Sequence, residues 1–249
     1  MDAAPHLVLL PGLDGTGELF APLLQALGDD VTTSVVRYGA ELTLDEYVES
    51  ASKALPDQCV LIAESFSGPV AITVAARHPG KVRCLVLCAT FAVSPFRPFL
   101  PAAKFVPARL FRPNPLLPSI VDYFCFNGAP ISLRPSPVAA LSTVPPAIMR
   151  ARLACLATVD VRSLLPRITT PVLYLRASND RVVSSRLSRQ VTSQLPNVQV
   201  REIDGPHLLL QTRPRECAAA IFDFLQADFQ ALTRPVTGGA SASPSSTAR

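Results

Sequence analysis

The chain has 249 residues, of which 49% are apolar and 17% charged, and its net charge is +4. This length fits one large domain or two small ones, and either can bury a sizeable core. The composition excludes the disordered class, which combines low hydrophobicity with high charge. The basic residues are spread thinly, without a Lys/Arg run that could follow a phosphate backbone, so we expect no nucleic-acid partner.

Membrane insertion and export are not expected either. Every apolar run is broken by Pro, Arg or Asp well before the roughly 18 residues that a membrane span needs. The first six residues lack the basic and apolar regions of a signal peptide. No C-x-x-C pair or Cys/His ligand spacing occurs among the six cysteines, Cys59, Cys84, Cys88, Cys125, Cys155 and Cys217. We therefore expect reduced, buried thiols in a cytoplasmic protein.

Short apolar runs alternate with longer amphipathic stretches along the chain, which is the pattern of βα units and a parallel sheet. Six strands are predicted, at Leu7–Leu10, Thr33–Arg37, Cys59–Ala63, Val82–Cys88, Val172–Arg176 and Val198–Ile203. Five helices fit between or after them, at Glu18–Leu27, Leu44–Leu55, Gly68–Arg77, Ser184–Gln194 and Pro214–Gln230. The predicted fold class is therefore α/β, with the core formed by residues 1–90 and 166–232.

Residues 91–165 interrupt this alternation, because a parallel βα repeat would place a strand about every thirty residues and none is indicated here. We interpret them as an inserted cap. Twelve of the 25 prolines lie between Pro95 and Pro146, which predicts short, separately oriented helices. Seven of the twelve phenylalanines lie between Phe91 and Phe126, either as an aromatic inner surface of the cap or as a second small core. Residues 233–249, rich in small and polar residues, are expected to be a disordered tail.

Ser65 is the candidate nucleophile. It follows a predicted strand and precedes an apolar helix in the segment Ala63-Glu64-Ser65-Phe66-Ser67. A sharp strand-to-helix turn exposes a serine oxygen above a sheet, and it needs small residues two positions before and after the serine. Ala63 and Ser67 are small, but neither is the glycine of the strict G-x-S-x-G pattern. The alternative is a serine that caps the helix.

A serine hydroxyl needs a base to take its proton, and the chain has three histidines. His207 lies in a loop directly after the last predicted strand, where parallel sheets place their sites. His6 precedes the first strand, and His78 ends a helix, where a solvated role is expected. His207 is therefore the predicted base.

The imidazole needs a carboxylate to orient it and to balance its positive charge. Asp180 follows the strand Val172–Arg176 in a short polar turn, and it is the predicted acid. Asp204 competes, but it lies in the same turn as His207 and is expected to bond its own backbone. The chain order Ser65, Asp180, His207 is the one expected of a particular hydrolase architecture.

The segment Pro11–Gly17 follows the first strand and contains three glycines, which can turn its amides toward Ser65. The N–H groups of Leu13 and Phe66 are the predicted oxyanion donors. Asp14 is expected to bond its own loop. A phosphate-binding loop is the alternative, but the segment matches neither the dinucleotide fingerprint nor a P-loop.

Taken together, these residues resemble the α/β-hydrolase superfamily from Leu7 to Leu232, and most closely its small bacterial carboxylesterases. The Pro11–Gly17 loop also resembles that of plant phytyl-ester acyltransferases. The resemblance implies the α/β-hydrolase fold, with a mostly parallel six-stranded sheet, helices on both faces and an inserted cap. The chain departs from the family at Ala63 and Ser67, and it begins at what would be the family's third strand, so the antiparallel edge should be absent.

The resemblance implies a serine esterase that acts on small-molecule esters of short to medium apolar acyl groups. No metal or cofactor is needed for that chemistry. Thioesterase, carbon–carbon bond hydrolase and acyltransferase use the same triad and stay open as alternatives. A non-catalytic ligand-binding protein with this fold is the alternative from a different class.

Overall fold

The computed structural model describes residues 5–95, 117–127 and 135–233. Its centre is one six-stranded sheet in the order β2-β1-β3-β4-β5-β6, in which all neighbours pair in parallel. The strands are β1 (Leu7–Leu10), β2 (Thr33–Val35), β3 (Cys59–Glu64), β4 (Val82–Cys88), β5 (Val172–Ala177) and β6 (Val198–Ile203). The predicted fold class and the six strands are confirmed, and the described sheet has no antiparallel edge strand.

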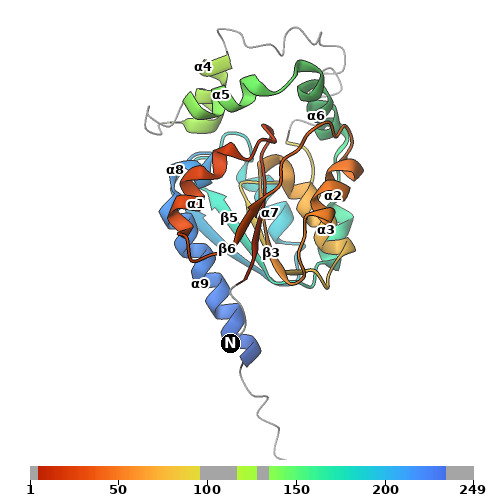
Figure 1. Ribbon diagram of the computed structural model, residues 1–249, viewed down its shortest axis with the longest axis vertical. Coiled ribbons are helices and arrows are strands. Elements are labelled where there is room, and N and C mark those ends of the chain that lie inside the picture. Colours follow the sequence, from red (N-terminus) through yellow and green to blue (C-terminus); the bar gives the residue numbers. More distant parts are fainter. Residues whose placement is uncertain (1–4, 96–116, 128–134, 234–249) are drawn as a thin grey trace, which may run out of the picture.

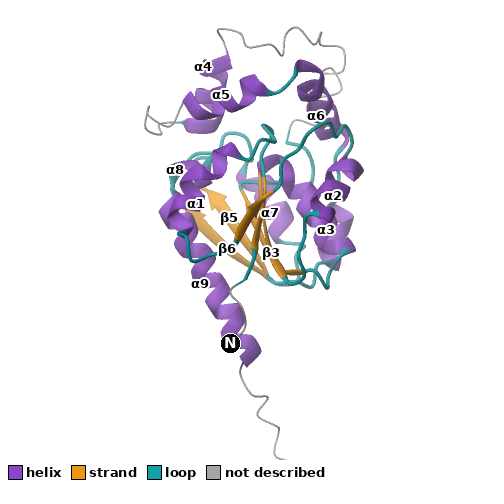
Figure 2. Ribbon diagram, in the orientation of Figure 1, coloured by secondary structure: helices purple, strands orange, loops and turns teal. Residues whose placement is uncertain are grey.

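Helices cover both faces of this sheet (Figures 1 and 2). Outside the segment between β4 and β5, the helices are α1 (Ala21–Leu27), α2 (Leu44–Lys53), α3 (Gly68–Arg77), α7 (Ser185–Thr192), α8 (Leu209–Thr212) and α9 (Pro214–Thr233). Short 3₁₀ segments precede two of them, η1 (Glu18–Phe20) before α1 and η2 (Ser65–Ser67) before α3. The predicted helix Glu18–Leu27 therefore begins as a 3₁₀ turn, and the last predicted helix runs three residues further than expected.

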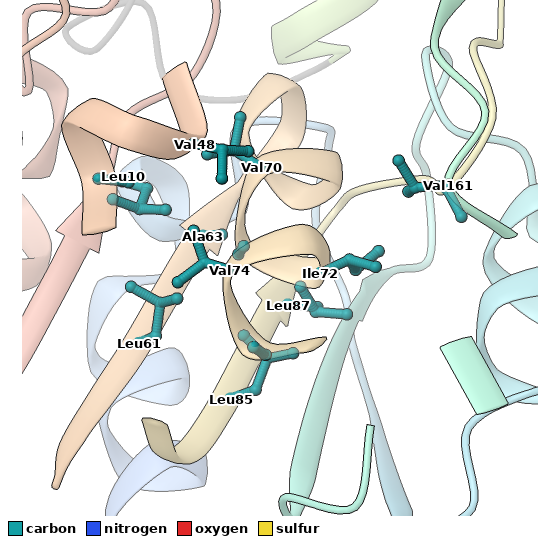
Figure 3. Close-up of a cluster of buried hydrophobic side chains, with 14 of the residues drawn as sticks. Leu10, Val48, Leu61, Ala63, Val70, Ile72, Val74, Leu85, Leu87 and Val161 are labelled. Carbon is teal, nitrogen blue, oxygen red and sulfur yellow. The ribbon is translucent and has the colours of Figure 1, made fainter. Parts of the chain in front are cut away.

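The strands are buried on both faces because alternate residues enter two separate clusters. In β1, Val8 and Leu10 pack in a cluster with α2, α3 and α7, whereas Leu7 and Leu9 pack in a second cluster with α1 and α9. Figure 3 shows the first cluster, with Val48 of α2 beside Val70 of α3 above β3 and β4. The edge strands β2 and β6 are less buried than the four central strands. Thus the apolar runs that predicted the strands become the middle layer of a three-layer core.

Between β4 and β5 the structure describes a group of helices at one end of the molecule, opposite the free end of α9 (Figure 1). They are α4 (Leu117–Val121), the π-helix η5 (Asp122–Phe126), α5 (Pro135–Thr143) and α6 (Pro146–Thr158). The 3₁₀ segment η7 (Arg162–Arg167) follows them and packs against α3 in the main core. An antiparallel bridge between Val93 and Asp160 joins the two ends of this segment. Not all of these helices are as short as the prolines suggested, since α6 has 13 residues and its single proline, Pro146, is its first residue.

The division of the chain at residues 90, 165 and 232 stays a prediction. Most of the expected tail lies outside the described residues, although α9 includes Thr233. No helix in the described part of the chain combines the length and the apolar character that crossing a membrane requires.

The six cysteines are free thiols, buried or half-buried. Burial raises the pKa of each, for example that of Cys59 to about 11, so they pack as neutral side chains.

Candidate active site

Ser65 stands where β3 ends and the segment η2 leads into α3. Its φ angle is +48°, a left-handed conformation that is uncommon for a residue with a side chain. Thr90 follows β4, and its hydroxyl donates a hydrogen bond of 2.5 Å to the Ser65 carbonyl oxygen. The turn is thus tied to the neighbouring strand end, which holds the serine in its strained conformation.

Three residues that are distant in sequence form a continuous hydrogen-bond chain. Ser65 Oγ lies 2.8 Å from His207 Nε2, and His207 Nδ1 lies 2.9 Å from Asp180 Oδ2 and 3.0 Å from Oδ1. These residues follow β3, β6 and β5, and the carboxyl ends of parallel strands meet at the same edge of the sheet. The structure therefore brings together the three side chains that the sequence singled out.

The Asp180 carboxylate is held by its own turn as well as by the histidine. Its Oδ1 accepts backbone hydrogen bonds from Val182 N–H at 2.8 Å and Val183 N–H at 2.7 Å. Both side chains of the pair are almost completely buried, at 5% exposed for His207 and 4% for Asp180. The two amides hold the Asp180 side chain in place, and its hydrogen bond with Nδ1 orients the imidazole so that Nε2 faces Ser65.

The pKa of His207 is raised above its ordinary value of 6.5. Burial by itself lowers it, because a buried imidazolium loses its hydration. The charge of Asp180 and its hydrogen bond act in the opposite direction and outweigh burial, with a smaller contribution from Glu64. The surroundings of His207 therefore favour the protonated form of the imidazole.

The competing residues lie elsewhere. His6 Nε2 is 3.0 Å from the Ser34 hydroxyl, and His78 caps the end of α3. Asp204 does not bond its own loop as expected; its Oδ1 accepts hydrogen bonds from Ser178 and Asn179. The expectation that Asp204 bonds its own backbone is wrong, because Ser178 and Asn179, which follow β5, donate to its side chain at the end of β6.

The small residue after the serine takes part in the turn. Ser67 donates its hydroxyl proton to the Pro11 carbonyl oxygen, and the Tyr38 hydroxyl lies 2.8 Å from Ser67 Oγ. Because Ser67 has one proton and has donated it, Tyr38 is the donor to Ser67. Burial raises the pKa of Tyr38 well above its ordinary value, so its phenol keeps that proton. The serine that replaces the family's glycine therefore links the turn at Ser65 to the loop after β1.

A glycine is nevertheless required one position later. A Cβ atom on Gly68 would collide with the Thr90 side chain, whose hydroxyl bonds the Ser65 carbonyl. The close approach of helix and strand thus falls on Gly68 rather than on position 67. This explains how the turn forms without a glycine at position 67.

The loop after β1 forms a tight turn beside Ser65. Gly15 N–H donates to the Gly12 carbonyl oxygen at 3.1 Å, and Gly15 and Gly17 have φ angles of +69° and +76°. Asp14 accepts hydrogen bonds from the Thr16 backbone N–H and hydroxyl, as expected. Leu13 is half-buried, and none of the described hydrogen bonds uses its N–H. Its role as an oxyanion donor with Phe66 stays a prediction.

Glu64 was not singled out from the sequence, although it precedes Ser65. Its side chain is 2% exposed, and its Oε2 accepts a hydrogen bond of 3.0 Å from Gln211 Nε2. Its Oε1 has no partner among the described residues. Burial raises the pKa of Glu64 to about 7, against the smaller effects of Gln211 and His207. A carboxyl group directly before a candidate nucleophile is a signal that could have drawn attention to it.

Only three of the seven phenylalanines in the expected cap lie within the described residues. Phe91 is buried in the main core cluster, Phe126 is buried beside Leu208, and Phe124 is 36% exposed. The other four, Phe96, Phe99, Phe105 and Phe111, lie outside the described residues. Phe91 thus belongs to the main core, whereas Phe126 packs next to the loop that carries His207.

Comparison with known proteins places the chain in a family. A model described as alpha/beta hydrolase family matches residues 7–220. A pimeloyl-(acyl-carrier protein) methyl ester esterase of Aromatoleum aromaticum is 26% identical over 204 residues, 74% of this chain and 80% of that protein. A putative carbamate hydrolase of Stutzerimonas stutzeri is 27% identical over 219 residues, 79% and 82% of the two chains. Phytyl ester synthase 1 of Arabidopsis thaliana is 30% identical over 123 residues, 44% of this chain and 18% of the plant protein.

Solved structures agree on the fold. The enol-lactonase of Burkholderia xenovorans superposes with a TM-score of 0.74 at 18% identity, covering 90% of this chain and 92% of that one. A thermophilic esterase of Thermogutta terrifontis superposes with a TM-score of 0.76 at 18% identity, covering 91% of each chain. With the family model spanning all six strands of the sheet and the relatives named as esterases and hydrolases, the chain belongs to the alpha/beta hydrolase family.

Proposed function

We propose that this protein is a serine esterase that hydrolyses carboxylic esters of short to medium apolar acyl groups through an acyl-enzyme intermediate. One observation carries the proposal: the continuous hydrogen-bond chain from Ser65 Oγ through His207 to the Asp180 carboxylate. A buried histidine held between a serine and a carboxylate is the arrangement that activates a hydroxyl group. The esterase and hydrolase names of the relatives support the same reaction class.

In the first half of the reaction, Ser65 Oγ attacks the ester carbonyl carbon while His207 Nε2 takes the hydroxyl proton. The carbonyl π bond becomes an oxyanion, and Asp180 balances the charge of the imidazolium. When the tetrahedral intermediate collapses, the bond to the alkoxy group breaks, and His207 gives its proton to the departing oxygen. The products are a free alcohol and an ester of Ser65.

In the second half, water replaces the alcohol. His207 Nε2 takes a proton from water as the oxygen attacks the acyl carbon, and the Ser65 oxygen leaves with that proton. The products are a carboxylic acid and the regenerated hydroxyl of Ser65. The side chains and amides of this chain supply all the groups that these steps use, so the proposal needs neither a metal nor a cofactor.

The proposed oxyanion hole consists of the N–H groups of Leu13 and Phe66. Donors fixed in advance at the place where negative charge develops lower the barrier because they need no reorganisation during the reaction. The unused Leu13 N–H and the hydroxyl link from Ser67 to the Pro11 carbonyl both support this assignment. The link keeps the loop after β1 next to the turn that carries Ser65 and Phe66.

The apolar acyl specificity rests on the segment between β4 and β5. Val121 and Phe126 pack with Leu208, the residue that follows His207, and Leu208 N–H donates to the Cys125 carbonyl oxygen at 3.3 Å. These contacts put apolar side chains of the segment beside the residue that follows the proposed base. Such a lining favours an apolar acyl group and disfavours a charged one.

Acyl transfer to an alcohol is the second candidate. It is favoured by the similarity to phytyl ester synthase 1 of Arabidopsis thaliana over 123 residues. The acyl-enzyme would be the same, and an alcohol instead of water would attack it. The two reactions differ only in which acceptor reaches His207.

The test is turnover of p-nitrophenyl acetate, butyrate, hexanoate and octanoate, with acyl-CoA thioesters for comparison and the Ser65→Ala protein as blank. We expect release of p-nitrophenol that rises from acetate to a medium chain and is absent from the blank. A wild-type protein with no turnover of any ester above the blank would contradict the proposal. Adding a long-chain alcohol and measuring the new ester against free acid separates transfer from hydrolysis.

A further inference from the structure

Arg152 is an unusual residue of the segment between β4 and β5. It lies on α6, it is 2% exposed, and it is among the largest fully buried side chains. An arginine buried so deeply is normally paired with a carboxylate. Among the residues that the structure describes, no carboxylate forms an ion pair with it. Its guanidinium instead donates its hydrogen bonds to backbone carbonyl groups of the loop after β1 and of the residues that follow β2.

Arg152 binds two successive carbonyl groups of the proposed oxyanion loop. Its Nη1 donates to the Leu13 oxygen at 2.9 Å and to the Asp14 oxygen at 2.6 Å. Its Nη2 donates to the Tyr38 oxygen at 3.3 Å. Tyr38 in turn donates its N–H to the Gly15 carbonyl oxygen at 2.8 Å. The arginine and the backbone of Tyr38 therefore hold the same loop together.

As a result, four consecutive carbonyl groups are fixed. The Gly12 oxygen accepts from Gly15 N–H, the Leu13 and Asp14 oxygens accept from Arg152, and the Gly15 oxygen accepts from Tyr38 N–H. A trans peptide group points its N–H away from its C=O. The Leu13 N–H belongs to the same peptide group as the Gly12 carbonyl, so the direction of this proposed donor is set once the turn is fixed.

The backbone of the loop is also shaped to admit the arginine. Gly15 has a φ of +69°, and a Cβ atom there would collide with the Arg152 guanidinium. The glycine thus meets two needs, a left-handed turn and the close approach of a cation to the backbone. A side chain whose only task was to anchor α6 would not need to sit against the peptide groups of this turn.

From this geometry we infer that Arg152 is a positioning residue for the oxyanion hole: α6 contributes the guanidinium that holds the Leu13 amide in its donor orientation. This inference rests on the proposed function. Arg152 does not touch the reacting atoms; it acts through the loop. Its loss should weaken stabilisation of the tetrahedral intermediate and leave ester binding nearly unchanged, because the ground-state carbonyl carries less charge than the oxyanion.

The test compares Arg152→Met, which removes the charge and all three bonds, with Arg152→Lys, which can keep one or two of them. Arg150→Met is the matched control, since Arg150 is an exposed arginine on the same helix. We expect kcat for p-nitrophenyl butyrate to fall about 10- to 100-fold in Arg152→Met, less than for removal of a whole donor. KM should stay within about threefold of wild type. Arg152→Lys should recover part of the loss, and Arg150→Met should behave as wild type.

A second readout separates positioning from general stability. A trifluoromethyl ketone adds to the serine as a tetrahedral oxyanion, whereas the matching methyl ketone binds without that charge. Inhibition by the trifluoromethyl ketone should weaken in Arg152→Met by about the factor lost in kcat/KM, and inhibition by the methyl ketone should not change. Rates are taken per active site, titrated with a fluorophosphonate well below the melting temperature.

Several outcomes would overturn the inference. They are unchanged kcat in Arg152→Met, equal weakening of both ketones, or unfolding of both the Met and the Lys variants, which would show that the guanidinium holds the whole fold. A wild-type protein without ester turnover would instead contradict the proposed function. The two failures are therefore distinguishable, because the first is seen only in the variants.

Discussion

In the proposed reaction Ser65 and His207 act on a single proton, so it should fail without either of them. Ser65→Ala and His207→Ala should each lower kcat for p-nitrophenyl butyrate by about 10⁶-fold. The double variant should be hardly worse than either single one, because the two groups act as a unit. Both variants should keep the wild-type melting temperature. Retention of more than a few per cent of activity by Ser65→Ala, in a preparation free of wild type, would refute the nucleophile assignment.

In the proposed reaction Asp180 influences both the rate and its pH dependence. In wild type, kcat/KM should rise with pH through the pKa of His207, so the midpoint of the acid limb should lie above 6.5, because only the neutral imidazole accepts a proton. Asp180→Asn removes the charge that raises this pKa and leaves burial, so the midpoint should move to lower pH. The same change should lower kcat by roughly 10⁴-fold, because the amide favours the wrong tautomer.

The pH–rate profile of Asp204→Asn is the matched control. Asp204 accepts hydrogen bonds from Ser178 and Asn179 and does not contact His207 through any described hydrogen bond. Its variant should therefore keep the wild-type midpoint and most of the wild-type rate. The reverse ranking of the two variants would move the acid to Asp204.

At the scale of elements, the close contact between the start of α3 and the end of β4 holds the turn at Ser65. Gly68→Ala puts a methyl group against Thr90 and should destabilise the protein by about 1–3 kcal/mol, the usual cost of overpacking. In a Thr90→Ala background the added methyl group should cost much less, because the side chain it meets has gone. Urea unfolding of the two single variants and the double variant measures this coupling; strictly additive effects would show that the two residues do not press on each other.

The segment that carries η5 should influence which acyl groups are accepted. Phe126 is fully buried beside Leu208, so Phe126→Ala opens space beside the residue that follows His207. The preferred acyl chain should lengthen, since each further buried methylene contributes up to about 0.8 kcal/mol, roughly fourfold in kcat/KM. Phe124→Ala, at a position that is 36% exposed, is the control and should leave the profile unchanged. A flat profile from acetate to octanoate in wild type would show that these rings do not select the acyl group.

The elements that could be predicted from sequence are those whose cause is local. Buried parallel strands appear as short apolar runs, and residues directly after them, such as Ser65 and His207, fall at one sheet edge without further information. Arg152 could not be found in this way, because its partner Leu13 lies 139 residues away and the contact depends on how α6 folds back. Likewise, the partners of Asp204 come from the turn after β5, not from its own loop.

For the whole molecule, the buried carboxyl of Glu64 makes stability depend on pH. The pKa of Glu64 in the folded protein is raised from 4.5 to about 7. The contribution of the protonated carboxyl to the unfolding free energy is therefore fully present below pH 4.5, and it is lost as the pH rises through 7. Glu64→Gln replaces the titrating carboxyl by a neutral amide, so the variant does not lose this stability as the pH rises. Relative to wild type, the variant should therefore gain up to about 3 kcal/mol in unfolding free energy between pH 4 and pH 8.

Urea unfolding of both proteins at a series of pH values measures this difference, and other titrating groups largely cancel in it. His207 is present in both proteins, and its pKa should fall slightly in the variant, because the charge of Glu64 is one of the smaller causes that raise it. A difference that does not change with pH would show that Glu64 has the same protonation in the folded and unfolded chains.

The positions of the three proposed catalytic residues in the chain have a consequence for biosynthesis. Ser65 precedes His207 by 142 residues, and the loop that carries His207 follows β6, the edge strand of the described sheet that pairs with β5. On the ribosome, β3 and its turn are made long before the base exists. A growing polypeptide therefore holds an ordinary, unreactive serine until β6 has been synthesised and has joined the sheet. Esterase activity would then report the arrival of the last strand, and could be followed as such during translation or refolding.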